Sequence, residues 1–268
     1  MKPCVDDLHV TAETPLMAQQ LVREYLQTRI LQSLEQAGAM ESLAFHGGTA
    51  LRFLYDIPRY SEDLDFALER ARERYDFRAF LLRIRADLMG EECTVDLKVS
   101  DRSVVHKAFV RFRGLPYELG LSPYKSQVLA VKLKVDTNPP PGAGLAVTSL
   151  TRHIPLVLQH HDRATLFSGK LHAVLQRPYP KGRDIFDLWW YLMQPDWPEP
   201  NLLQLNAALV QSRWPGPKLT AGNWRAVVRQ RVARLDWQEN VVRDVQAFII
   251  EPEVLDRLQK DALLALLA

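Results

Sequence analysis

The chain has 268 residues, of which 47% are hydrophobic and 25% are charged, and its formal net charge is +2. This composition is ordinary for a soluble globular protein, and the length allows one large domain or two small ones. Its two cysteines, Cys4 and Cys93, are too few for a disulfide framework or a cysteine metal cluster, which favours a reducing cytoplasm. No signal peptide and no run of eighteen apolar residues occurs, so we expect a cytoplasmic protein with no membrane partner.

The charge differs slightly between the two halves of the chain. Residues 1–150 contain 19 Lys and Arg against 20 Asp and Glu, a net of −1, whereas residues 151–268 contain 15 against 12, a net of +3. A mildly basic second half is compatible with a polyanionic partner. The asymmetry is too small to indicate nucleic-acid binding by itself.

The first half begins with helical and strand patterns in alternation. Apolar residues at helical spacing predict a helix over residues 14–37, and Gly38 ends it. A short strand over 43–45 leads into a Gly-Gly turn and a helix over 49–54. A second long helix is predicted over 75–89.

Four strand-like runs follow, and their β-branched content predicts a sheet with one solvated face. They cover residues 94–100, 104–112, 116–120 and 127–137. A strand, a helix and further strands in this order predict a mixed α/β (α+β) domain.

The segment 138–144, Asn-Pro-Pro-Pro-Gly-Ala-Gly, is the clearest break in the chain. We therefore expect one domain over residues 1–150 and a helical domain over 151–268. The predicted helices of the second domain cover about 165–177, 183–193, 201–212, 222–234, 238–249 and 253–267.

Residues 46–66 contain the most informative pattern, HGGTALRFLYDIPRYSEDLDF. Alternate residues of a strand point to the same face, so Asp63 and Asp65 project together. Two adjacent carboxylates repel unless a positive charge lies between them, and Mg²⁺ (or Mn²⁺) binds carboxylate and phosphate oxygens together. The Gly47-Gly48 turn at a helix start offers backbone N–H groups to a triphosphate.

Each half of this pattern also has an ordinary structural interpretation. A Gly-Gly pair is commonly a simple turn, and an Asp-x-Asp pair is commonly a solvated strand face. Their occurrence together, with a strand before and a helix between them, favours a metal-dependent nucleotidyl transfer site.

The same residues resemble motif I of the AbiEii-type nucleotidyltransferases, the toxins of type IV abortive-infection toxin–antitoxin systems. That family belongs to the DNA polymerase β-like nucleotidyltransferase superfamily. The matching residues are Gly47, Gly48, Thr49, Ala50, Leu51, Arg59, Ser61, Asp63, Leu64, Asp65 and Phe66.

A second block, FSGKLHAVLQRPYPKGRDIFDLWW, resembles the distal motifs of the family. It places Lys170, Arg183, Asp184 and Asp187 in the family pattern, and the whole resemblance covers roughly residues 40–195.

The resemblance implies a nucleotidyltransferase-fold mixed sheet followed by a C-terminal helical domain that completes a nucleotide cleft. It implies catalytic roles for Asp63, Asp65, Lys170 and Asp184, and metal binding by Asp63 and Asp65. Substrate contacts are implied for Gly47, Gly48, Thr49, Arg59, Ser61 and Arg183.

A third carboxylate on a neighbouring strand is the usual complement of the superfamily. Asp136 is the candidate for this third metal ligand, because it ends a strand and shares a face with Lys132 and Lys134. Asp96 is its competitor, and Asp136 also fits an ordinary strand end.

Other candidate residues have structural alternatives. Ser61 could orient a phosphate or become modified, but a loop serine commonly forms a turn hydrogen bond. Asp184 lies in the first turn of a helix, where an acid is stabilising in any case. Charge predicts a Lys170–Asp184 pair, whereas Arg183 and Asp187 could simply join helices.

The predicted activity is transfer of a nucleoside monophosphate from an NTP to an acceptor, with tRNA implied by some family members. A cognate antitoxin acting without a stable complex is a further implied partner. The alternatives are a transferase that modifies a protein or small molecule, and a non-catalytic nucleotide- or RNA-binding protein. The sequence does not identify the acceptor or the preferred NTP.

Overall fold

A computed structural model describes residue 12, residues 14–91 and residues 93–268. Cys4 and the N-terminal segment, for which the sequence predicts no signal peptide, lie outside the described residues. The chain divides into two compact units that interleave along the sequence. Unit 1 takes its described residues from 1–54, 60–138 and 147–160, and unit 2 consists of 55–59, 139–146 and 161–268.

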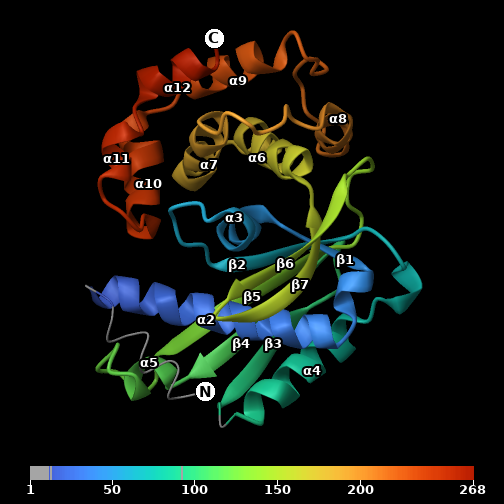
Figure 1. Ribbon diagram of the computed structural model, residues 1–268, viewed down its shortest axis with the longest axis vertical. Coiled ribbons are helices and arrows are strands. Elements are labelled where there is room, and N and C mark those ends of the chain that lie inside the picture. Colours follow the sequence, from blue (N-terminus) through green and yellow to red (C-terminus); the bar gives the residue numbers. More distant parts are fainter. Residues whose placement is uncertain (1–11, 13, 92) are drawn as a thin grey trace. The chain divides into compact units, whose positions relative to one another are not determined.

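Unit 1 is built around a seven-stranded mixed sheet (Figure 1) with the order β3-β4-β5-β2-β1-β7-β6. The strands are β1 (Leu43–His46), β2 (Asp63–Leu68), β3 (Val95–Ser100), β4 (Val105–Arg113), β5 (Val128–Asp136), β6 (Leu145–Arg152) and β7 (Ile154–His161). At the centre, β2 pairs antiparallel with β1 and parallel with β5. The predicted mixed α/β class is confirmed.

Three helices complete the main framework of unit 1: α2 (Pro15–Gln36), α3 (Gly47–Tyr55) and α4 (Phe77–Met89). The Thr14 hydroxyl accepts a hydrogen bond from Met17 N, and the Asp76 carboxylate accepts one from Ala79 N, so side chains cap the starts of α2 and α4. Helices α2 and α4 pack against each other, and they contact β5 and β3 respectively. The predicted helices over 14–37, 49–54 and 75–89 are therefore confirmed.

The strand expected over 116–120 is wrong. Residues Leu115–Glu118 form the short helix α5, which starts after Gly114 in the left-handed region (φ +73°). Pro116 lies in its first turn, where a missing N–H costs nothing because that donor has no helical partner.

Strands β6 and β7 lie in a region where the sequence pattern predicts no helix or strand. The Pro-rich segment suggested a domain boundary near residue 150, and that position falls inside β6. The chain instead returns to the sheet after this segment, and β7 pairs in parallel with β1 through Phe45 and His160.

Unit 2 is helical over most of its length. Its helices are α6 (Arg163–Gln176), α7 (Gly182–Leu192), α8 (Leu202–Gln211), α9 (Trp224–Ala233), the π-helical turn η3 (Gln238–Val242), α10 (Arg243–Val245), η4 (Gln246–Phe248), α11 (Val254–Arg257) and α12 (Lys260–Leu266). The four longer helices predicted before residue 235 are confirmed. The two predicted after it are each interrupted, because η3, α10 and η4 change helix type and α11 ends at Arg257 before α12 begins.

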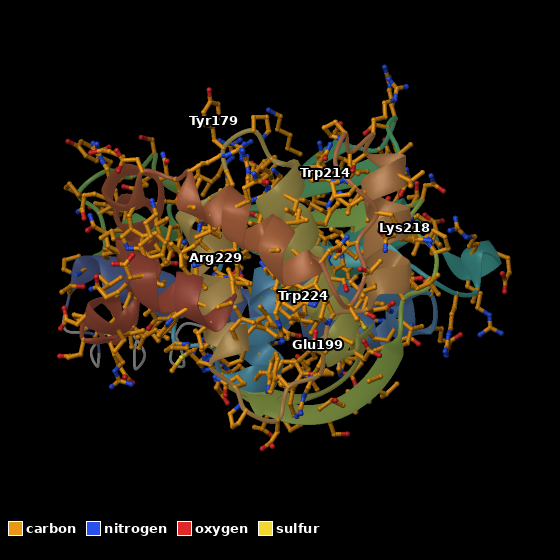
Figure 2. All side chains as sticks on the ribbon, turned by 90° about the horizontal axis from the view of Figure 1, so that it is seen from above. Tyr179, Glu199, Trp214, Lys218, Trp224 and Arg229 are labelled. Carbon is orange, nitrogen blue, oxygen red and sulfur yellow. The ribbon has the colours of Figure 1, made fainter. Side chains whose placement is uncertain are left out.

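Aromatic side chains fill the core of unit 2. Phe167 stacks on Tyr191 with ring centroids 4.3 Å apart and meets the edge of Trp224, which is 1% exposed. The indole Nε1 of Trp224 donates to Glu199 at 2.9 Å, and both residues are labelled in Figure 2. Burial of the ring with its polar atom satisfied explains why tryptophan is tolerated here.

A buried ion cluster joins α2, α3 and the end of β6 in unit 1. Glu24 is 5% exposed, and its carboxylate lies 2.8 Å from Arg52 Nε and 3.2 Å from Arg152 Nε. Burial alone would raise the pKa of Glu24, but hydrogen bonding by His153 and the charges of Arg52 and Arg152 lower it to about 2.

Glu24→Gln is expected to lower the free energy of unfolding by about 3 kcal/mol at pH 7, since it removes the buried charge that pairs with the partly buried guanidinium groups of Arg52 and Arg152. The folded-state pKa of Glu24 lies below its ordinary value of 4.5, so its contribution is complete above that value and is lost as the pH falls toward 2. Urea denaturation of the two proteins between pH 7 and pH 3 should therefore show a shrinking difference.

Glu41→Gln serves as the control, because Glu41 and its partner Arg74 are both more than half exposed. Its effect should stay below about 0.5 kcal/mol at each pH. A Glu24→Gln difference that does not change with pH would contradict the assignment of the stability to this carboxylate.

Candidate active site

The two acids of the first motif lie side by side on β2. Asp63 and Asp65 are about one third and one quarter exposed, at 34% and 24%, whereas Leu64 and Phe66 between and after them are buried. Strand alternation produces this division, because the apolar pair anchors β2 in the core and turns both carboxylates to the other face. The face predicted from the sequence is confirmed.

An ammonium group lies between these carboxylates. Lys134 Nζ is 2.5 Å from Asp63 Oδ2 and 2.9 Å from Asp65 Oδ1. Burial alone would lower the pKa of Lys134, but Asp65 and Asp63 outweigh it and the pKa is raised. From the sequence, Lys134 is predicted only to share a strand face with Asp136, and no role at the site is predicted for it. Alternation along β5 together with a parallel register with β2 would have suggested one.

The Gly-Gly turn packs directly against this acid pair. Gly47 has φ +80°, a conformation that disfavours side chains, and a Cβ at this position would lie 2.8 Å from Asp65 Oδ2. Gly47 and Gly48 begin helix α3, so the N-terminal end of the helix faces the region of the carboxylates. A helix N-terminus beside a pair of acids suits a ligand that carries both phosphate and a cation.

Thr49 in α3 and Ser61 just before β2 both form hydrogen bonds that position the start of β2. The buried Thr49 hydroxyl donates to the backbone carbonyl of Asp63 at 2.5 Å, which ties the helix to the strand. The Ser61 carbonyl accepts from Gln27 Nε2 at 2.9 Å. These bonds give both residues positioning roles in the loop, whereas the substrate contacts expected of them remain predictions.

The sheet separates the two candidates for a third carboxylate. Asp96 lies on the edge strand β3, three strand positions from β2, or about 14 Å away at the usual strand spacing. It forms ion pairs with Arg111 and Arg113. Asp96 is therefore too distant to share an ion with Asp63 and Asp65.

Asp136 shares the face of Lys134 on β5 and pairs in register with Ala67, two residues beyond Asp65. Its carboxylate accepts a hydrogen bond from Asn138 N at 2.9 Å. Within the described part of the chain, no group of three or more His, Cys, Asp or Glu residues is arranged to hold a metal ion. Asp136 is thus not gathered with the acid pair into a three-carboxylate site.

The second motif forms a buried charge cluster in unit 2. Asp187 on α7 is fully buried and receives two hydrogen bonds of 2.6 Å from Arg59, through Nε and Nη2. Lys170 on α6 lies 2.7 Å from Asp187 Oδ2 and 3.6 Å from Asp184 Oδ1, and Arg177 pairs with Asp184. The predicted Lys170–Asp184 pair is present, but Asp187 is the closer partner of Lys170.

Three cations and two acids make this cluster positive by one charge. Burial alone would raise the pKa of Asp187, but Arg59 and Lys170 outweigh it and keep the carboxyl ionised with a lowered pKa. Lys170 is itself largely buried, with 9% of its surface exposed. Arg59, for which the family resemblance implies a substrate contact, directs Nε and Nη2 of its guanidinium to Asp187.

Arg183 lies next to a different part of unit 2. Its guanidinium is 3.9 Å from the Phe248 ring centroid, and its Nε is 3.6 Å from Asp244 Oδ2. The neighbouring Gly182 lets the start of α7 lie against the backbone of η3, because a Cβ at this position would lie 2.1 Å from Val241 O. These contacts favour the interpretation that Arg183 joins α7 to α10 and η4, and its substrate contact remains a prediction.

The model of one protein family, described as the nucleotidyl transferase AbiEii toxin of type IV toxin–antitoxin systems, matches residues 29–259. The chain belongs to this family. The matched range contains both charge clusters described above, and the chain is accordingly a nucleotidyltransferase. The sequence-based resemblance is confirmed. Among curated proteins, none matched the chain.

Two solved structures of low sequence identity support the fold of this AbiEii-family nucleotidyltransferase. MenT4, a nucleotidyltransferase toxin from Mycobacterium tuberculosis, is 17% identical, with a TM-score of 0.52 and 99% of each chain covered. JHP933 from Helicobacter pylori is 18% identical, with a TM-score of 0.51, and the match covers 92% of this chain and 88% of that one. Across the described ranges, the AbiEii-family chain contains no helix that is long and apolar enough to cross a membrane.

Asp187→Asn is expected to destabilise the nucleotidyltransferase by about 3–5 kcal/mol, since it leaves Arg59 and Lys170 buried beside a neutral amide. Thermal and urea denaturation would measure the loss. Asp196→Asn, the same change at an exposed position, is the matched control and should change stability by less than about 0.5 kcal/mol. Equal effects of the two substitutions would show that the buried network does not stabilise unit 2.

Proposed function

We propose that this nucleotidyltransferase moves a nucleoside monophosphate from an NTP to an RNA acceptor, with tRNA as the first candidate. The observation that carries the proposal is the pair of carboxylates on β2, held against the glycine turn that begins α3. An acceptor hydroxyl attacks the α-phosphorus, a new P–O bond forms, and the bond to the β-phosphate oxygen breaks to release pyrophosphate.

The donor set fits a hard divalent cation such as Mg²⁺ or Mn²⁺. Asp63 and Asp65 offer carboxylate oxygens on one partly exposed face, and Mg²⁺ commonly binds one or two carboxylates together with substrate phosphates. Bound there, the cation would polarise the phosphates and stabilise the charge of the leaving group. Asp136, on the same face farther along β5, would serve as an outer ligand at most.

Other residues of the chain would bind the phosphates of the NTP and position the groups that contact them. Backbone N–H groups at the Gly47–Gly48 turn bind phosphate oxygens, and the dipole of α3 favours negative charge at that end. Lys170 supplies a positive charge to the β- and γ-phosphates, with Asp184 and Asp187 holding its ammonium in place. Asp187 and Arg59 act through Lys170 as positioning residues.

The acceptor and the biological role rest on the family. Its description as a type IV toxin supports a growth-inhibiting modification and an antitoxin that acts without a stable complex. The net charge of +3 over residues 151–268 is compatible with a nucleic-acid acceptor.

Asp63→Asn and Asp65→Asn are each expected to lower transfer by about a hundredfold or more, because they remove charge that binds the cation and stabilises the transition state. Incubation with each of the four α-labelled NTPs, with total tRNA in one arm and lysate protein in the other, would measure transfer and identify the acceptor. Each variant should fold, since Lys134 keeps one carboxylate partner.

Asp96→Asn is the matched control, because Asp96 is a strand carboxylate distant from the site and should leave transfer within about twofold. Undiminished transfer by Asp63→Asn and Asp65→Asn would remove the proposed chemistry. If the label enters protein and not tRNA, the proposed nucleotidyl transfer would stand, but its acceptor would be a protein.

Lys170→Ala is expected to weaken NTP binding by about 1.5–3 kcal/mol, the usual size of a hydrogen bond to a charged group. Arg59 still pairs with Asp187 in this variant, so folding should survive. Titration with a non-hydrolysable NTP analogue would report affinity, and thermal denaturation would report stability. Lys181→Ala, an exposed lysine in the same unit, is the control. Unchanged affinity for the analogue in Lys170→Ala would assign the second motif to structure alone.

A further inference from the structure

Lys134 occupies the position between the two carboxylates where a cation would bind. We propose that Lys134 is a built-in counter-ion of the acid pair, which competes with a divalent cation and yields to it when nucleotide arrives with the metal. This inference rests on the proposed function, because it takes Asp63 and Asp65 as the metal ligands. Competition between Lys134 and the cation would make metal binding at that site depend on nucleotide binding.

The strand register selects Lys134 for this position. In the parallel ladder of β2 and β5, Lys134 lies opposite Asp65 and Lys132 lies opposite Asp63. The buried residues Leu133 and Val135 fix both lysines on the solvated face. The ammonium of Lys134 contacts both acids, whereas Lys132 Nζ lies over the Phe109 ring, 5.4 Å from its centroid.

The position of the Lys134 ammonium reduces the repulsion between the Asp63 and Asp65 carboxylates. Two like charges on one strand face repel, and an ammonium within 2.5 and 2.9 Å of both removes that repulsion without a metal. With Lys134 in place, the pair presents a net charge of −1 to an incoming cation. A cation bound to the same oxygens would have the ammonium as its immediate neighbour, so the two cannot be held there equally well.

Nucleotide changes this balance. A metal–triphosphate complex brings anionic oxygens that complete the coordination of the cation, and those oxygens also offer the displaced ammonium a new partner. The free ion lacks both advantages. The consequence is that this nucleotidyltransferase should bind a free divalent cation weakly and bind it tightly together with NTP.

The test is Mn²⁺ binding to the full chain, followed by electron paramagnetic resonance, first without nucleotide and then with a non-hydrolysable NTP analogue. Lys134→Met removes the ammonium and keeps the length of the side chain. Its Mn²⁺ affinity without nucleotide should rise by about tenfold or more, as expected for loss of one positive charge a few ångströms from the cation. The gain in affinity on adding the analogue should be smaller in the variant than in the unaltered protein.

Lys132→Met is the matched control, because it makes the same change on the same strand face and should leave Mn²⁺ affinity within about twofold. Lys134→Gln, which also lacks the charge, replaces Lys134→Met if the latter does not fold, and the same increase is expected. Thermal denaturation gives a second readout: Mn²⁺ without nucleotide should raise the melting temperature of the Lys134 variants more than that of the unaltered protein.

Equal or weaker Mn²⁺ binding by both Lys134 variants would overturn the counter-ion role, and the proposed metal site would stand if Asp65→Asn still abolished binding. Mn²⁺ binding that does not depend on Asp63 or Asp65, with or without the analogue, would instead overturn the metal site and this inference together. An equal increase in Lys132→Met would show a general charge effect and overturn the specific role of Lys134.

Discussion

The pairing of β2 in the middle of the sheet is the constraint on which the candidate site depends. Its buried residues, Leu64 and Phe66, are held between β1 and β5, and this fixes the direction of every second side chain. A slip of one residue would bury Asp63 and Asp65 and expose the apolar pair. The same register brings Lys134 beside the acids, so one set of backbone hydrogen bonds sets the position of both charges.

Each unit neutralises its clustered carboxylates with lysine or arginine side chains of its own. Unit 1 places Lys134 between two partly exposed carboxylates, an arrangement open to exchange with another cation. Unit 2 buries Asp187 completely and surrounds it with Arg59 and Lys170, an arrangement that is costly to disrupt. The difference in burial leaves the first cluster accessible to a ligand and keeps the second packed inside unit 2.

Much of the fold followed from local pattern. Helices α2, α4 and α6 begin at side-chain caps, and the alternation of β5 is complete along its length. Prediction failed where local signals conflicted with tertiary pairing. Residues 115–118 turned helical after Gly114, and β6 and β7 joined the sheet beyond a Pro-rich segment that looked like a domain end. Strand pairing over such separations depends on partners that no local window contains.

Sequence patterns alone identify the family and the residue types of the candidate site, because a glycine turn, an acid pair and a distal lysine are local features. They also predict that Asp63 and Asp65 share a face, which follows from the two-residue period of a strand. Which charges meet depends on how the elements pack together. In the folded protein, Lys134 lies between the two acids and Arg59 pairs with Asp187. Asp96 lies on the edge strand β3, far from the acid pair. The physical reason is that ion pairs depend on register and packing between elements far apart in the chain, whereas periodicity fixes only the direction of each side chain within its own element.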